Sequence, residues 1–102
     1  MYWRDIGYLC IEDERIDSLG KPYKVYDRRE VFCNEKGVKR NEFYQAQIAG
    51  MRPELCVEIK EIDYNKESHF EYKGIMYRII RTYPVKNECL EVICQSLVAD
   101  NG

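Results

Sequence analysis

The sequence has few of the side chains from which catalytic and metal-binding sites are usually built. It contains a single histidine, His69, and no two of its five cysteines are spaced as in a C-x2-C motif. The closest pair, Cys89 and Cys94, does not match the spacing of a zinc knuckle. No glycine-rich phosphate loop, G-x-S-x-G elbow or H-E-x-x-H helix occurs. We therefore expect a protein that is not an enzyme and that holds neither a metal ion nor a cofactor.

For the cysteine, histidine and acidic side chains that do occur, a structural role is a simpler interpretation than a catalytic or metal-binding one. An odd number of cysteines without metal spacing is typical of buried, reduced thiols that act as small apolar side chains. His69 has no serine or cysteine partner apparent in the sequence, and we expect it at the surface or in a turn rather than as a general base. Glu58, Glu61 and Asp63 alternate along an expected strand, which indicates a solvated face rather than a metal site.

Long apolar runs and an excess of positive charge are also absent. No segment approaches the length of a membrane span, and no charged-then-apolar leader opens the chain. With 16 basic and 18 acidic residues the net charge is −2, so the chain lacks the positive field of a general DNA-binding protein. We expect a protein without a membrane segment, made in a cytoplasm, for which DNA is not the main ligand.

Tyrosine, by contrast, is abundant: the 102 residues include nine tyrosines, against three phenylalanines and one tryptophan. Tyrosine suits half-buried strands and contact surfaces, where its ring packs and its hydroxyl stays in water. Apolar residues make up 45% of the chain, which is enough for one modest core. We expect a single domain over residues 1–102, with 98–102 as a frayed tail.

Alternation of apolar and polar residues predicts a chain built mainly of strands. A tight turn is expected at Lys73-Gly74, where glycine can take a positive φ without steric conflict. Pro84 is expected to end the strand after that turn, because proline cannot donate a ladder hydrogen bond. The long second strand is expected to bend or bulge across its charged middle, 27–30. The expected strands cover residues 7–12, 23–35 and 54–60, a hairpin over 70–80, and residues 88–97, with a polar turn at 17–22.

One segment departs from the strand pattern. Between Asn41 and Met51 apolar residues recur at helical spacing, Asn41 suits a helix N-cap, and Gly50 followed by Pro53 suits its end. A loop of mixed charge precedes this helix. We therefore expect a mainly β fold, namely a small, partly closed antiparallel β-barrel or sandwich of five to six strands with one short helix in the loop after the second strand.

Aromatic and basic residues alternate along 77–83, and two interpretations of them stay open. Tyr77, Arg81 and Tyr83 are expected on one face, where they would form a contact surface. On a small barrel, such a face can also stack the bases of a single-stranded nucleic acid. Alternatively, this is a central strand whose tyrosines pack and whose arginines pair with acidic residues on neighbouring strands. The negative net charge favours the second interpretation.

Two segments of the chain resemble bacteriophage head-tail connector proteins, the family of head-closure or stopper proteins. One is the stretch N-E-F-Y-Q-A-Q at 41–47, with Gly50, Pro53-Glu54 and the strand that follows. The other is the hairpin 71–83, which carries the pattern E-Y-x-G-x-x-Y-x-I-x-R and is followed by L-E-x-x-C at 90–94. The similarity spans about residues 23–95. Its specificity lies in the order and spacing of these elements together.

The resemblance implies a structural component of a phage or prophage virion, made in the host bacterial cytoplasm and located at the head-tail interface. It implies a homo-oligomeric ring in the particle and a monomer in isolation, with the portal-adaptor protein on one side and a tail-completion or tail-tube protein on the other. Packaged DNA would pass through the channel, and the 34–51 loop would face that channel and help to retain the DNA. A tail-completion or terminator protein of the same phage module, and a small β-barrel that binds single-stranded nucleic acid, remain alternatives. The expected loop residues are Lys36, Lys39, Arg40, Glu42, Phe43 and Tyr44.

Overall fold

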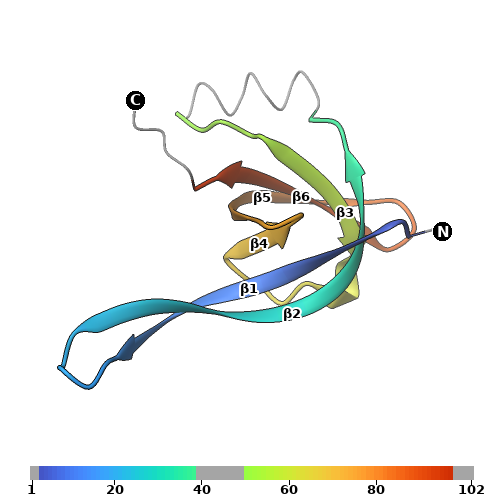
Figure 1. Cartoon of the computed structure of the whole chain (residues 1–102). Helices are drawn as coiled ribbons and strands as arrows, with labels where there is room; N and C mark the ends of the chain where they lie inside the picture. Colours follow the sequence, from blue (N-terminus) through green and yellow to red (C-terminus); the bar gives the residue numbers. More distant parts are fainter. Residues whose placement is uncertain (1–2, 39–49, 98–102) are drawn as a thin grey trace.

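The fold is one antiparallel sheet of six strands that closes into a ring (Figure 1). The computed structural model describes residues 3–38 and 50–97. Neighbouring strands follow the order β1-β2-β3-β6-β5-β4, and β4 pairs in turn with β1. The mainly β prediction is therefore confirmed, whereas most of the expected helix (41–49) and the expected tail lie outside the described residues. The elements are β1 (Asp5–Ile16), β2 (Pro22–Lys36), β3 (Leu55–Lys60), the 3-10 turn η1 (Glu61–Asp63), β4 (His69–Tyr72), β5 (Ile75–Val85) and β6 (Cys89–Ser96).

The interior of the ring holds the apolar side of each strand. Leu9 of β1, Phe70 of β4 and Val92 of β6 have no exposed surface. They alternate with outward residues because successive side chains of a strand point to opposite faces. Gly7 is also on the inner face, and the ring of Phe70 occupies the place where a Gly7 side chain would lie. The core cluster is Leu9, Val31, Cys33, Leu55, Val57, Ile59, Phe70, Tyr72, Leu90, Val92 and Cys94.

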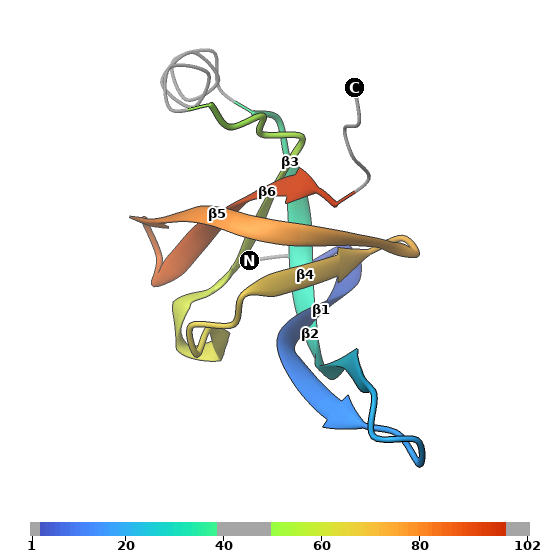
Figure 2. The ribbon, with the colours of Figure 1, turned by 90° about the vertical axis from the view of Figure 1, so that its left-hand side faces the viewer.

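β1 and β2 continue beyond the ring as a two-stranded hairpin. They pair without a break from Asp5 opposite Cys33 to Ile16 opposite Pro22. β4 pairs with β1 only at 8–10, and β3 pairs with β2 only at 34–36. Residues 11–27 therefore form a projecting ribbon, called the arm below (Figures 1 and 2). The unbroken register rules out the bulge considered for 27–30, and β2 curves along its length instead (Figure 1).

A buried ion pair ties the base of the arm to the loop after η1. The side chain of Glu67 is only 3% exposed, and its Oε2 lies 2.6 Å from Nη2 of Arg29. The other oxygen, Oε1, accepts the backbone N–H of Asn65 at 2.7 Å, and Arg29 also donates to the carbonyl oxygen of Asp63. The buried carboxylate is therefore held by a cation and a backbone donor together.

Pro84 does not end β5, contrary to expectation. The strand continues to Val85, and Pro84 lies opposite Leu90 of β6. β4 pairs with β5 only as far as Arg78, so among the described strands none pairs with that edge of β5 near Pro84. A proline there removes no hydrogen bond that the ladder needs, which is why the strand tolerates it.

Candidate functional site

The structure describes only one of the six residues that were expected to form a channel loop. Lys36 is described, and the other five, Lys39, Arg40, Glu42, Phe43 and Tyr44, lie outside the described residues. Lys36 does not belong to a loop, because 34–36 are the last residues of β2 and pair with 56–58 of β3. Its Nζ lies 3.6 Å from Oε1 of Glu58. The predicted loop start at residue 34 is therefore wrong, since β2 must extend this far to meet β3 and close the ring.

The face predicted to carry Tyr77, Arg81 and Tyr83 is divided by an irregularity in β5. The register against β6 shifts between Ile79 and Arg81, which leaves Ile80 as an extra residue in the ladder. Tyr77 packs against the core, whereas Arg81 and Tyr83 lie on the outer face and share a hydrogen bond of 2.9 Å from Arg81 Nη1 to the Tyr83 hydroxyl. The prediction that all three share one face is wrong. A stacking platform for single-stranded bases along this strand thereby loses one of its two tyrosines.

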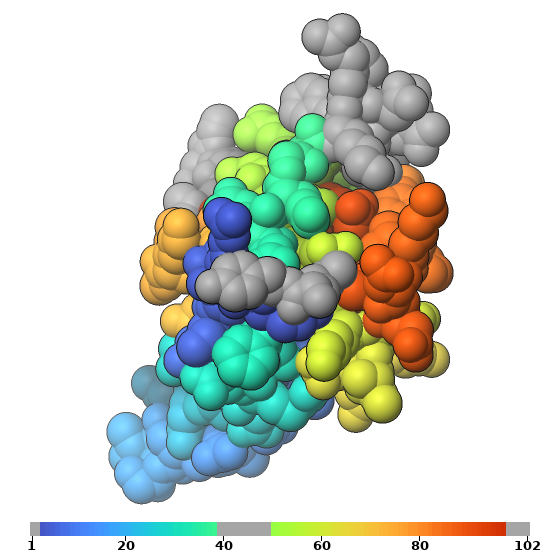
Figure 3. All heavy atoms as spheres, turned by 90° about the vertical axis from the view of Figure 1, so that its right-hand side faces the viewer, coloured from blue at the N-terminus to red at the C-terminus, as the bar shows by residue number. Residues whose placement is uncertain are grey.

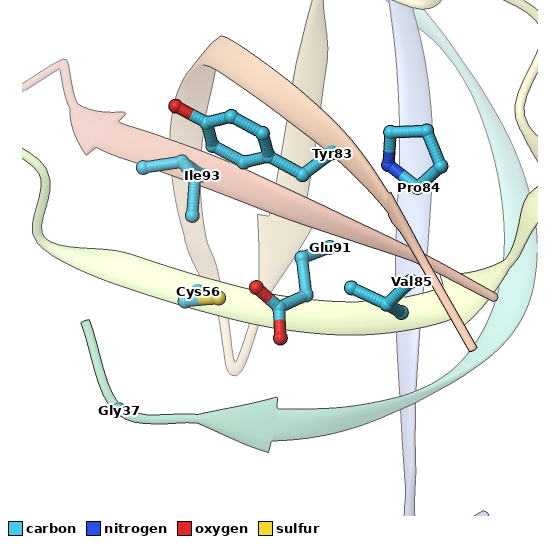
Figure 4. Close-up of a pocket in the computed structure, with 7 residues that line it drawn as sticks. All are labelled: Gly37, Cys56, Tyr83, Pro84, Val85, Glu91 and Ile93. Atoms are coloured by element: carbon cyan, nitrogen blue, oxygen red, sulfur yellow. The ribbon is translucent and has the colours of Figure 1, made fainter. Parts of the chain in front are cut away.

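A pocket of about 290 Å³ lies on the outer face beside Tyr83 (Figure 4). Cys56 and Ile93, each 2% exposed, contribute to its wall, together with the carboxylate of Glu91. The structure thus brings Gly37, from the segment predicted as the loop, near Tyr83, from the predicted interface. A pocket that is mainly apolar and this small suits one side chain of a partner protein. Its described lining is Gly37, Cys56, Tyr83, Pro84, Val85, Glu91 and Ile93.

A second group of aromatic and charged side chains covers the outer face of β1, β2 and β4. The ring centroids of Tyr26 and His69 are 5.0 Å apart. Arg28 forms an ion pair with Glu71 and lies over the ring of Tyr8, 5.6 Å from its centroid. His69, expected at the surface or in a turn, is instead a strand residue with 6% of its surface exposed. The contact with the Tyr26 ring explains part of this burial.

The burial of His69 predicts a pH-dependent stability. Burial lowers the pKa of His69 below its ordinary value of 6.5. The negative charge of Glu12 raises this pKa, whereas the positive charges of Arg78 and Lys24 lower it further. Below pH 6.5 the unfolded chain therefore binds a proton that the folded chain lacks. We expect the free energy of unfolding to be highest above pH 6.5 and to fall as the pH decreases toward the folded pKa. One proton sets an upper limit of about 1.4 kcal/mol per pH unit.

Urea titrations between pH 7.5 and pH 5.5 measure this slope. The variant His69→Gln cannot take up the proton, and it should show a flatter dependence over the same range. An equal slope in the two proteins would assign the effect to other groups.

The acidic residues considered for a metal site are separated by the end of β3. Glu58 is 8% exposed on β3, and Glu61 and Asp63 belong to η1, so they do not share a solvated strand face as expected. Within 3–38 and 50–97, no three His, Cys, Asp or Glu side chains are grouped so as to hold a metal ion. No helix in that part of the chain is long and apolar enough to cross a membrane. All five cysteines are buried and outside any disulfide, as predicted, and burial raises the pKa of Cys33 to about 12.

The arm is the candidate site that sequence reasoning missed. Ile16 and Leu19, at its tip, are 72% and 79% exposed. The expected first strand ended at residue 12, four residues before β1 ends. A sequence cue did exist, because Glu12 and Glu14 precede the predicted turn and the oppositely charged Lys24 follows it. Lys24 and Glu12 form an ion pair of 3.0 Å across the arm.

The chain was also compared with known proteins. A scan against models of protein families found no match, and a search of curated proteins found no match either.

Proposed function

We propose that this chain is a structural, non-enzymatic component of a phage virion that joins the DNA-filled head to the tail. The observation that carries the proposal is the resemblance of 41–54 and 71–83 to head-tail connector proteins, in that order and at that spacing. The second segment includes most of the β4–β5 hairpin, whose tight turn is at Lys73-Gly74. In the particle, identical copies form a ring beneath the portal and adaptor, and a tail-completion or tail-tube protein docks on the other side.

The shape of the domain suits a role in assembly. A closed sheet offers few open strand edges to unspecific pairing. The last residues of β2 and the first of β3 meet at one end of the ring, and the arm leaves the other (Figures 1 and 2). Such a subunit can direct the segment after Gly37 toward a channel while its arm contacts a neighbouring protein. These features support the proposal without depending on any catalytic group.

Binding to phage heads is the test of this proposal. We expect the purified chain to bind DNA-filled heads that carry portal and adaptor but lack this protein, and to stop DNA loss from them. A Gly-Ser linker of equal length in place of 39–49 removes the side chains expected to face the channel. This variant should still bind the heads but should fail to retain the DNA, measured as nuclease-protected DNA per head.

Two other outcomes would contradict the proposal. Failure to bind heads, combined with tight and salt-sensitive binding of a single-stranded oligonucleotide, would support a nucleic-acid-binding protein instead. Binding to isolated tails but not to heads would indicate a tail-completion or terminator protein.

A further inference from the structure

The tip of the arm is an exposed apolar surface with basic side chains beside it. Ile16 and Leu19 are exposed, and Arg15 and Lys21 flank them. The carboxylate of Asp17 stabilises the turn at the tip. Its Oδ1 accepts hydrogen bonds from the backbone N–H groups of Leu19 at 2.8 Å and Lys21 at 2.9 Å. The tip therefore presents two aliphatic side chains and the cation of Lys21 in a fixed turn, while Arg15 forms exposed ion pairs with Asp13 at 3.8 Å and Asp27 at 3.7 Å.

A pocket of complementary character lies between η1 and the turn that joins β5 to β6. These two segments are at the opposite end of the molecule from the arm tip (Figure 1), and Figure 3 views the molecule from their side. It has a volume of about 530 Å³ and is called the η1 pocket below. Trp3 and Ile62, which is 88% exposed, provide apolar surface. Glu61 and Glu88 provide two carboxylates against one cation, from Lys60. The η1 pocket is thus apolar and net acidic, whereas the tip (residues 15–21) is apolar and carries two cations against the one carboxylate of Asp17.

The η1 pocket is also held in shape before any partner arrives. The turn beside it contains two successive residues with positive φ, Asn87 at 63° and Glu88 at 58°. Such conformations persist where the surroundings hold them. Here the backbone N–H of Glu61 donates to the carbonyl oxygen of Glu88 at 3.0 Å, which fixes η1 against the turn. A partner that docks there loses little binding energy to ordering the pocket.

We propose that the arm tip of one copy docks into the η1 pocket of the next copy. Leu19 is the apolar anchor against Trp3 and Ile62, and the cation of Lys21 faces Glu61 and Glu88. The tip and the η1 pocket are different surfaces at opposite ends, so the contact is heterologous and repeats from copy to copy until a ring closes. The inference deepens the proposed function, on which it rests for the ring.

Site-specific cross-linking between two copies tests the contact. One preparation carries Ser18→Cys beside the anchor, and the other carries Lys86→Cys beside the η1 pocket. The five native thiols are buried, so a short bismaleimide should react mainly with the introduced cysteines. In a mixture of the two at roughly 1 mM, we expect a cross-linked dimer. Leu19→Asp in the first preparation should reduce its yield at least about tenfold, because it removes the anchor.

Charge reversal and a matched control complete the test. Lys21→Glu should lower the yield by about threefold, and Glu88→Lys in the partner copy should restore it. The control pairs Ser18→Cys with Arg52→Cys, an exposed residue outside the η1 pocket. A yield no higher than this control, or one unchanged by Leu19→Asp, overturns the inference. Cross-linking by a protein that fails to bind heads would overturn the phage role alone, and head binding without cross-linking would overturn only the docking.

Discussion

Replacing Gly7 by alanine is expected to lower the free energy of unfolding by about 3 kcal/mol, which is at the upper end for an overpacked core. A Cβ on Gly7 would collide with Cζ of Phe70 and would lie within 3.0 Å of both Cε atoms. The Phe70 ring is fully buried and stacks at 6.2 Å on Tyr72, so it has little space into which to move. Urea denaturation monitored by tyrosine and tryptophan fluorescence measures the loss.

Gly37→Ala is the matched control for this change, because no heavy atom lies within 4 Å of its Cβ position. We expect it to change stability by less than about 0.5 kcal/mol. The double variant Gly7→Ala/Phe70→Leu tests the cause, since leucine vacates the position of Cζ. It should be clearly more stable than the sum of the two single changes implies, whereas strict additivity would rule out the proposed collision.

Replacing Arg29 by methionine is expected to destabilise the domain by about 2 kcal/mol. The change leaves the carboxylate of Glu67 buried without its cation, and losing one partner of a fully buried pair costs about 3–5 kcal/mol. We expect less here because the side chain of Arg29 is 46% exposed, so water partly screens the pair. Equilibrium urea unfolding at pH 7.5 measures the effect.

The control for Arg29→Met is Arg15→Met in the arm. Arg15 lies 3.7 Å from Asp27 in an ion pair whose two side chains are more than half exposed, so its loss should cost less than about 0.5 kcal/mol. Adding Glu67→Gln to Arg29→Met removes the orphaned charge and should recover part of the stability. If Arg29→Met proves as mild as Arg15→Met, the buried pair does not anchor the arm.

Local patterns in the sequence predicted the elements whose structure depends on neighbouring residues. The turn at Lys73-Gly74 follows from glycine's freedom to adopt a positive φ, and Gly74 has a φ of 81°. The inward positions of β3 and β6 follow from alternation, and Leu55, Val57, Leu90 and Val92 all lie in the core. Each of these predictions needed only a few adjacent residues.

Features that depend on distant residues escaped prediction. The extra residue Ile80 separates Tyr77 from Arg81, and it is visible only against the register of β6. Pro84 remains in a strand because the pairing of β5 with β4 stops at Arg78, which no local pattern around Pro84 reveals. The burial of His69 depends in part on Tyr26, which belongs to another strand. The η1 pocket likewise joins residues from three separate parts of the chain.

Closure of the ring also sets the order in which the chain can fold during synthesis. Cys10 of β1 pairs with His69 of β4, roughly 60 residues later, whereas β1–β2 and β4–β5 are local hairpins that need no distant partner. On the ribosome, the 8–10 edge of β1 therefore stays unpaired until most of the chain has emerged. A nascent chain that ends before residue 69 should be the species most prone to aggregate through this edge. Once β4 has emerged and paired with β1, this edge is covered and the chain can no longer aggregate through it.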